Sequence, residues 1–183
     1  MKVVETEIEG VRVLEPSVWE DERGYFFESF SQRRFEAEVG KVVFVQDNES
    51  KSVYGVVRGL HYQLPPYTQA KLVKVVRGKV LDVVVDIRKN SPAFGRHLAI
   101  ELSESNKRQL FVPKGFAHGF AVLSEEVIFQ YKCDEYYVPE SEAGIRFDDP
   151  CLQIDWEIPR EKMILSAKDL SLRAWQETSG LDI

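Results

Sequence analysis

The chain has three histidines, the side chains best suited to proton transfer near neutral pH. His61 lies in the run Gly59–Gln63 (GLHYQ), and His118 lies in the run Gly115–Phe120 (GFAHGF). Glycines close to both positions permit β-bulges or a close approach of the backbone near a binding site. His97 follows a Gly-Arg pair in a predicted turn, so we expect it to be solvated. A single histidine is more often structural than catalytic, which leaves His61 and His118 as candidates only.

Proton transfer also needs an acid and a carboxylate that orients the base. Ser166–Asp169 (SAKD) matches a capping box, so the simplest interpretation of Asp169 is a helix-capping acid. Tyr131 lies in the alternating run Val127–Cys133, where a strand would place it on an apolar face. Such a face suits a barrel interior, in which a tyrosine is ordinarily a core residue with a partner for its hydroxyl. The same phenol could donate a proton into a pocket.

Short alternating segments separated by turn residues must position these side chains. The strongest period-2 pattern runs over Lys79–Ile87, with Leu81 and Val83 on one face and Asp82 and Val84 on the other. The other predicted strands are Gly10–Leu14, Tyr25–Phe30, Phe44–Asn48, Leu72–Val76, Leu98–Leu102, Gln109–Val112, Gly119–Leu123 and Val127–Cys133. Many short strands are typical of an all-β sandwich or barrel.

Helices are predicted to be few and short. One covers Phe30–Val39 and ends before Gly40, and another begins near Ser166. No repeat or convincing linker interrupts the chain. We therefore expect one all-β domain over residues 1–183, with an N-terminal arm and a short C-terminal helix.

Composition excludes several classes of protein. Among 183 residues, 44% are hydrophobic and the net charge is −6 with no basic run, so nucleic acid is an unfavourable partner. No apolar stretch is long enough to cross a membrane, and the acidic first ten residues do not form a signal peptide. Cys133 and Cys151 lack Cys-x-x-Cys spacing and are interpreted as reduced thiols of a cytoplasmic protein.

Several sequence blocks together resemble one family, the cupin-type dTDP-4-dehydrorhamnose 3,5-epimerases. The blocks are Gln46–Asn48 (QDN), Gly55–Gln63 (GVVRGLHYQ), Gln69–Val73 (QAKLV), Val85–Gly95 (VDIRKNSPAFG), Asn106–Phe120 (NKRQLFVPKGFAHGF), Phe129–Glu142 (FQYKCDEYYVPESE) and Leu165–Asp169 (LSAKD). They cover nearly the whole chain in order. The resemblance implies a cupin-like jelly-roll β-barrel, a homodimer and a dTDP-sugar substrate, with no metal and no cofactor.

The resemblance also implies roles for particular residues. Inverting a carbon beside a ketone needs a base, an acid on the opposite face and a cation for the enolate oxygen. By resemblance His61 is the base, Asp169 orients it, Tyr131 is the acid and Lys71 stabilises the enolate. Tyr136 and Tyr137 are rivals for the acid role, but the family position is Tyr131. The expected reaction converts dTDP-4-dehydro-6-deoxy-D-glucose into dTDP-4-dehydro-L-rhamnose by inversion at C3 and C5.

Substrate-binding residues follow from the same resemblance. Arg23 and Arg58 match diphosphate-binding positions, which suit the planar guanidinium group. His118 is expected to contact the sugar or phosphate region. The remaining matched positions are Glu28, Gln46, Asn48, Glu142 and Lys168. Residues near the N-terminus are expected to serve the partner subunit of a dimer.

Three other functions share part of this pattern of residues. A metal-dependent cupin needs a His-x-His pair with further ligands, whereas His61 is followed by Tyr62 and Gln63. An epimerase that inverts a single carbon would share the same base, acid and lysine, so the motifs separate it poorly. A non-catalytic sugar-nucleotide-binding protein would not need a matched acid and base.

Overall fold

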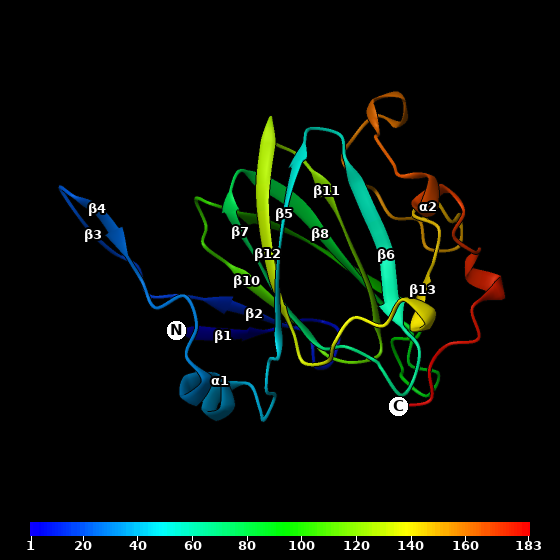
Figure 1. Cartoon of the computed structure of the whole chain (residues 1–183), viewed down its shortest axis with the longest axis horizontal. Coiled ribbons are helices and arrows are strands. Elements are labelled where there is room, and N and C mark those ends of the chain that lie inside the picture. The colour runs from blue at the N-terminus through cyan, green and yellow to red at the C-terminus, as the bar shows by residue number, and fades with distance from the viewer.

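The structure, a computed structural model, describes residues 1–183 and is built mainly from two antiparallel sheets (Figure 1). The larger sheet has the order β1 (Lys2–Glu5), β2 (Arg12–Glu15), β10 (Gln109–Val112), β7 (Lys71–Arg77), β12 (Glu126–Cys133) and β5 (Gln46–Val53). The smaller sheet has the order β13 (Glu142–Gly144), β6 (Val57–Gln63), β11 (Phe116–Val122), β8 (Lys79–Asp86) and β9 (His97–Ser103). This cupin-like architecture confirms the predicted fold class.

The barrel interior is an apolar layer supplied by both sheets. Val73 of the larger sheet, Val84 of the smaller sheet and Phe129 of β12 are fully buried in this layer. A second layer covers the outer face of the smaller sheet, where Leu81 and Val83 meet Trp156 from the C-terminal segment. Strand β8 therefore contributes to both layers, as the alternation over Lys79–Ile87 predicts, and Asp82 lies on its interior face.

Helix α1 (Gln32–Glu38) packs against the outer face of the larger sheet through Phe35. Ser31 caps its first turn, and the amide of Gly40 donates to the carbonyl of Phe35 just after the helix ends. The second helix, α2 (Ala167–Leu170), begins after its cap Ser166, as predicted. Single 3₁₀ turns lie at Pro139–Ser141, Arg160–Lys162 and Trp175–Glu177.

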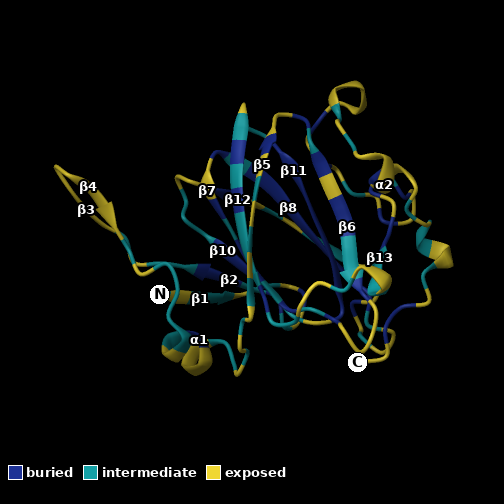
Figure 2. Cartoon of the chain, viewed as in Figure 1, coloured by how far each residue is buried: buried dark blue, intermediate teal, exposed yellow.

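A small hairpin projects from the body of the molecule. It pairs β3 (Trp19–Asp21) with β4 (Gly24–Phe26), and Figure 2 shows both strands as exposed. Trp19 and Phe26 are 58% and 71% exposed, which is unusual for large aromatic side chains. An exposed apolar cluster of this kind is typical of a contact surface.

Two predicted strands differ in extent from the observed ones, and the strand that carries His61 was missed. The predicted strand Tyr25–Phe30 ends at Phe26, because the following aromatic residues turn back toward the larger sheet. The predicted strand Phe44–Asn48 begins only at Gln46 and continues to Val53, through polar residues at a sheet edge. Strand β6, which carries His61, was not predicted, because Gly59 interrupts its alternation.

Candidate active site

Two adjoining cavities lie between the sheets at one end of the barrel. Their volumes are about 260 and 590 Å³, and Asn48, His61, Lys71 and Tyr131 line both of them. The smaller cavity also contacts Gln46 and Glu142, whereas the larger one reaches Arg58, His118, Ser166, Lys168 and Asp169. The structure therefore brings together side chains that are far apart in the sequence.

A β-bulge in β6 directs His61 into the barrel. His118 pairs with His61 and Phe120 pairs with Arg58, so β6 has one more residue than β11 between these two pairs. The additional residue places Arg58 and His61 on the same side of β6, and both line the larger cavity. Gly59 is required there: its φ is +109°, and an added Cβ would lie 2.6 Å from the carbonyl oxygen of His118.

His61 and Asp169 form a close pair at the cavity wall. His61 Nε2 lies 2.7 Å from Asp169 Oδ1, although its N–H bond is not aimed along this line. Asp169 Oδ1 also accepts from the Gly59 amide at 3.3 Å, and Oδ2 accepts from Ser166 Oγ at 2.6 Å. Burial would raise the pKa of Asp169, but the contacts with His61 and Ser166 outweigh it and lower the pKa to about 2. Asp169 is thus both a capping residue and the carboxylate beside His61.

Neither ring nitrogen of His61 makes a hydrogen bond within the chain. Nε2 lies beside the Asp169 carboxylate but is not aligned with it, and Nδ1 faces away from it. A carboxylate beside Nε2 favours the tautomer with the proton on that nitrogen, because the N–H can then donate to it. Nδ1 then carries the lone pair, which is the state that a general base requires.

The opposite wall of the cavities comes from the larger sheet. Lys71 on β7 places its Nζ 5.9 Å from the ring centroid of Tyr131 on β12, and no side chain forms an ion pair with this ammonium group. Desolvation lowers the pKa of Lys71, opposed in part by Cys133 and Asp82. Desolvation also raises the pKa of Tyr131, so its phenol keeps its proton at neutral pH. The two groups therefore present a lysine amine without an ion-pair partner and a neutral phenol to the cavity.

A second histidine–aspartate pair lies deeper in the barrel. His118 Nε2 is 3.0 Å from both carboxylate oxygens of Asp82, and its ring stacks on Phe129. Asp82 is fully buried, and burial raises its pKa against the opposing charges of His118 and Lys71. Asp82 was not predicted as a site residue. The sequence does contain a signal for it, because a carboxylate on the interior face of a valine-rich strand rarely lacks a partner.

The predicted nucleotide-binding side chains form a polar rim beside the cavities. Glu142 accepts from Tyr137 Oη at 2.6 Å and forms an ion pair with Lys168. Gln46 donates to Asn48 Oδ1 at 3.0 Å. Arg58 donates to Ser52 Oγ at 3.1 Å. These residues offer donors, acceptors and cations within reach of a ligand that extends out of the barrel.

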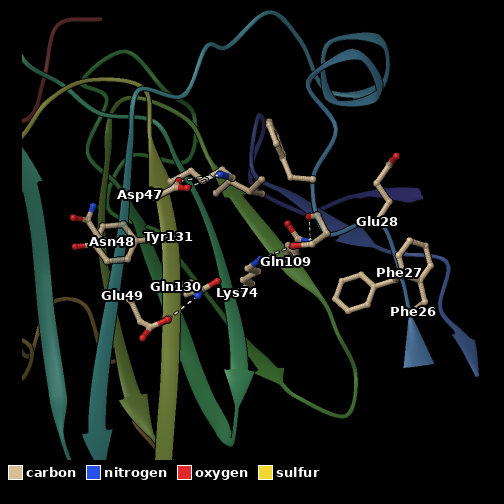
Figure 3. Close-up of a pocket in the computed structure, with 14 residues that line it drawn as sticks. Phe26, Phe27, Glu28, Asp47, Asn48, Glu49, Lys74, Gln109, Gln130 and Tyr131 are labelled. Carbon is tan, nitrogen blue, oxygen red and sulfur yellow. Dashed lines mark hydrogen bonds and ion pairs between the residues drawn. The ribbon is translucent and has the colours of Figure 1, made fainter. Parts of the chain in front are cut away.

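Two predicted site residues lie elsewhere in this chain. Arg23 is on the projecting hairpin, where its side chain is 84% exposed and paired with Asp21. Glu28 lines a different cavity of about 600 Å³, on the outer face of the larger sheet. Figure 3 shows Lys74 and Gln130 on this outer side, whereas Tyr131 and Asn48 are turned to the opposite side of the strands. Neither Arg23 nor Glu28 lines the His61 cavities.

Two further properties concern metals and membranes. No group of three or more His, Cys, Asp or Glu side chains comes together to form a metal-binding cluster. Neither helix is long and apolar enough to span a membrane.

The chain is similar to known epimerases over nearly its whole length. Residues 5–177 match the sequence profile of a family described as dTDP-4-dehydrorhamnose 3,5-epimerase. The chain is 55% identical over 172 residues to a dTDP-4-dehydrorhamnose 3,5-epimerase of Shigella flexneri, covering 93% of this chain and 94% of the relative. Among solved structures, a dTDP-4-dehydrorhamnose 3,5-epimerase from Elizabethkingia anophelis is 52% identical, with a TM-score of 0.93 and 97% of each chain covered. A dTDP-6-deoxy-D-glucose-3,5-epimerase from Legionella pneumophila, solved with dTDP-4-keto-L-rhamnose, is 50% identical, with a TM-score of 0.91, 94% of this chain covered and 92% of that chain.

Proposed function

The chain belongs to the dTDP-4-dehydrorhamnose 3,5-epimerase family and has that activity in dTDP-L-rhamnose biosynthesis, and we propose that the cavities around His61 are where it acts. One observation carries this proposal. His61 comes from the smaller sheet, whereas Lys71 and Tyr131 come from the larger sheet, and all three face the same space. A base and an acid on opposite walls suit a reaction that removes a proton from one face of a carbon and returns one to the other.

We propose that His61 Nδ1 removes the proton. The hydrogens at C3 and C5 of a 4-keto sugar are acidic because each carbon neighbours the C4 carbonyl group. When Nδ1 takes such a proton, the C–H electron pair forms a double bond between that carbon and C4. The π electron pair of the carbonyl group moves to its oxygen, which becomes an enolate oxygen. The nearby Asp169 carboxylate stabilises the resulting imidazolium, and its pKa of about 2 keeps it ionised throughout.

Lys71 and Tyr131 complete the inversion in this proposal. The unpaired Lys71 ammonium stabilises the enolate oxygen, and Tyr131 gives its phenolic proton to the opposite face of the carbon. The carbonyl group then re-forms. His61 releases its proton to solvent and Tyr131 takes one back, so each inverted carbon acquires a solvent hydrogen. The same groups can act twice, once at C3 and once at C5.

The rim residues are proposed to bind the dTDP portion. Arg58 and Lys168 supply cations for the diphosphate, while Gln46, Asn48 and Glu142 supply polar contacts. His118 lies at the deep end of the larger cavity, where it can contact the sugar. The relative from Legionella pneumophila was solved with dTDP-4-keto-L-rhamnose, which supports a ligand of this class.

We also propose a homodimer in which Arg23 and Glu28 serve the partner subunit. The hairpin that carries Arg23 projects away from the barrel (Figure 1). Its Trp19 and Phe26 side chains are exposed. Burial of these aromatic rings against a second copy would remove their contact with water. Within one chain Arg58 and Lys168 are the cations proposed for the diphosphate, and a partner's Arg23 would add another.

Proton NMR in heavy water tests the proposed chemistry directly. The wild-type protein should incorporate deuterium at both C3 and C5 of dTDP-4-dehydro-6-deoxy-D-glucose and form the L-sugar. Tyr131→Phe should still exchange hydrogen at a carbon but should lose inversion by on the order of 10²-fold or more, because it retains the base without the acid. An unchanged product ratio in this variant would mean that another group is the acid.

Mixing two inactive variants tests the shared site. Arg23→Ala and His61→Ala should each lose activity alone. After subunit exchange, half of the dimers are mixed and each has one complete site, so about a quarter of the wild-type activity should return. No recovery from an exchanged mixture would place Arg23 in its own subunit's site. Light scattering on the same samples measures the oligomeric state.

Residues 1–183 are proposed to form one domain. The C-terminal segment supplies Phe147, Trp156 and Leu181 to the layer that covers the smaller sheet, so it cannot separate without exposing that layer. A single cooperative thermal transition, detected identically by tryptophan fluorescence and far-UV circular dichroism, is expected. Two separate transitions would contradict a single domain.

The proposed location is the cytoplasm. Cys133 and Cys151 are both free, which suits a compartment that keeps thiols reduced. Cell fractionation with an antibody against the protein should find it with cytoplasmic markers, and recovery in a secreted fraction would contradict this proposal.

A further inference from the structure

The orientation of the Asp169 carboxylate depends on few contacts. Oδ1 faces His61 at 2.7 Å and accepts from the Gly59 amide at 3.3 Å, a long hydrogen bond. Oδ2 has one hydrogen-bond donor, the hydroxyl of Ser166, at 2.6 Å. Because His61 Nε2–H is not aimed at Oδ1, a small rotation of either side chain decides whether the pair is aligned. The Ser166 hydroxyl is the shortest contact that opposes rotation of the carboxylate.

Ser166 holds both the backbone and the side chain of Asp169. Its Oγ accepts from the Asp169 amide at 3.1 Å and donates its only proton to Asp169 Oδ2. The first bond is an ordinary helix cap, whereas the second fixes the side-chain torsion angles relative to that cap. A water molecule could replace the donor, but it would not be tied covalently to the backbone that holds Asp169.

The segment that carries Ser166 is fixed to the strand that carries His61. The Ile164 amide donates to the Gly55 carbonyl at 2.8 Å, and the Val57 amide donates to the Ile164 carbonyl at 3.0 Å. Ile164 thus pairs with the start of β6, two residues before Ser166. Two backbone hydrogen bonds at Ile164 therefore define the position of the serine hydroxyl relative to the strand that carries His61.

We propose that Ser166 is a positioning residue for the epimerisation. Its hydroxyl holds the Asp169 carboxylate so that Oδ1 stays beside His61 Nε2, and the imidazole thereby keeps its catalytic orientation. This inference rests on the proposed role of the His61–Asp169 pair. Ser166 acts through Asp169, so its loss should lower kcat while leaving KM nearly unchanged. Misalignment of a catalytic group by a fraction of an ångström to 1 Å costs on the order of ten- to a hundred-fold in rate.

The alternative is that Ser166 serves only as the cap of α2, a helix of four residues. Glycine separates the two roles, because Gly replaces Ser at a cap with little loss of stability, whereas Ala does not. Neither residue has a hydroxyl group that could hold the carboxylate. Threonine keeps both hydrogen bonds, and because Ser166 is exposed, the added methyl group has room.

The experiment measures kcat, KM and deuterium incorporation for Ser166→Gly, Ser166→Ala and Ser166→Thr. Ser31→Ala is the matched control, because Ser31 caps α1 in the same way, far from the cavities. We expect kcat of the Gly and Ala variants to fall by about ten- to a hundred-fold, equally in both, with KM within about two-fold of wild type. Ser166→Thr should restore kcat, and Ser31→Ala should not change it.

Several results would overturn the proposal. If the Ala variant loses activity but the Gly variant does not, Ser166 is only a cap. If either variant loses its near-UV circular dichroism together with its activity, Ser166 supports the fold rather than the pair. His61→Ala in the same assay distinguishes the proposed role of His61 from that of Ser166. Retained exchange in His61→Ala would refute the proposed base itself, whereas an inactive His61→Ala beside a fully active Ser166→Gly would refute only the role of Ser166.

Discussion

Two histidine–aspartate pairs lie in the same barrel, and they differ in what surrounds the carboxylate. Asp169 meets His61 at the cavity wall and accepts additional hydrogen bonds from Ser166 and Gly59. Asp82 meets His118 in the interior, where His118 is its only hydrogen-bonding partner. The pKa of Asp169 is lowered to about 2, whereas burial raises the pKa of Asp82.

The number of hydrogen-bond donors to the carboxylate, rather than the presence of a histidine, therefore decides whether such a pair can take part in proton transfer. A carboxylate with several donors stays ionised and can stabilise an imidazolium formed during a reaction. Full burial with a single partner makes the ionised form of a carboxylate unfavourable, so such a carboxylate serves mainly to hold that partner in place. Accessibility follows the same division, since the His61 side chain is 28% exposed and that of His118 only 8%.

The largest expected effect comes from deleting each histidine. His61→Ala should lower deuterium exchange at C3 and C5 by on the order of 10⁴-fold, whereas His118→Ala should lower it by about ten-fold and raise KM. Stability should change in the opposite order. His118→Ala should lose about 1–3 kcal/mol of unfolding free energy, because it leaves the buried Asp82 without a partner, and His61→Ala should lose little. Proton NMR and urea unfolding measure the two effects, and a shared ranking in both would contradict the division of roles.

The next effect comes from neutralising each carboxylate. Asp169→Asn should lower kcat by on the order of 10²- to 10³-fold, because the amide cannot stabilise an imidazolium or fix the tautomer of His61. Asp82→Asn should lower kcat by less than about ten-fold while reducing the melting temperature by a few degrees. Steady-state kinetics and calorimetry on both variants provide the test. Equal losses of kcat would mean that the interior pair also takes part in proton transfer.

The smallest effect is on the pH dependence of stability. The folded pKa of Asp169, about 2, lies below 3.8, so its carboxylate contributes stability that is present above pH 3.8 and lost as the pH falls toward 2. The folded pKa of Asp82 is raised above 3.8, so its contribution is present below pH 3.8 and lost as the pH rises through the folded pKa.

Urea unfolding at a series of pH values measures this dependence. Asp169→Asn should flatten the stability curve below pH 3.8, by up to about 2 kcal/mol, whereas Asp82→Asn should flatten it above that value. Identical curves for the two variants would show that the carboxylates titrate alike in the folded protein.

Sequence patterns predicted the central strands because those strands alternate over a buried face. Strand β8 extends over Lys79–Asp86, within one residue of the predicted segment, and β12 contains all of Val127–Cys133. Strand β6 was not predicted, because the glycine that positions its histidine also interrupts its alternation. Gly59 permits the bulge that directs His61 into the barrel, and the same residue breaks the period-2 pattern.

Contacts between distant strands could not be predicted from local patterns. The pairing of Asp82 with His118 depends on the register of β8 against β11, which places Asp82 opposite Phe120. Sequence analysis selected His118 but gave it no partner. The Ser166–Asp169 capping box was predicted correctly, yet the position of α2 beside β6 depends on the hydrogen bonds of Ile164. Only the folded chain reveals that the cap and the pair share one carboxylate.

The place of Asp169 along the chain has a consequence for protein synthesis. Every strand of both sheets ends by Gly144, whereas Asp169 is synthesised after all of them. A nascent chain can therefore form the barrel and the Asp82–His118 pair before the carboxylate that pairs with His61 has been synthesised. A product of premature termination that lacks Asp169 would keep the walls of the cavity without this partner. Competence for proton transfer thus arises only after all the strands have been synthesised.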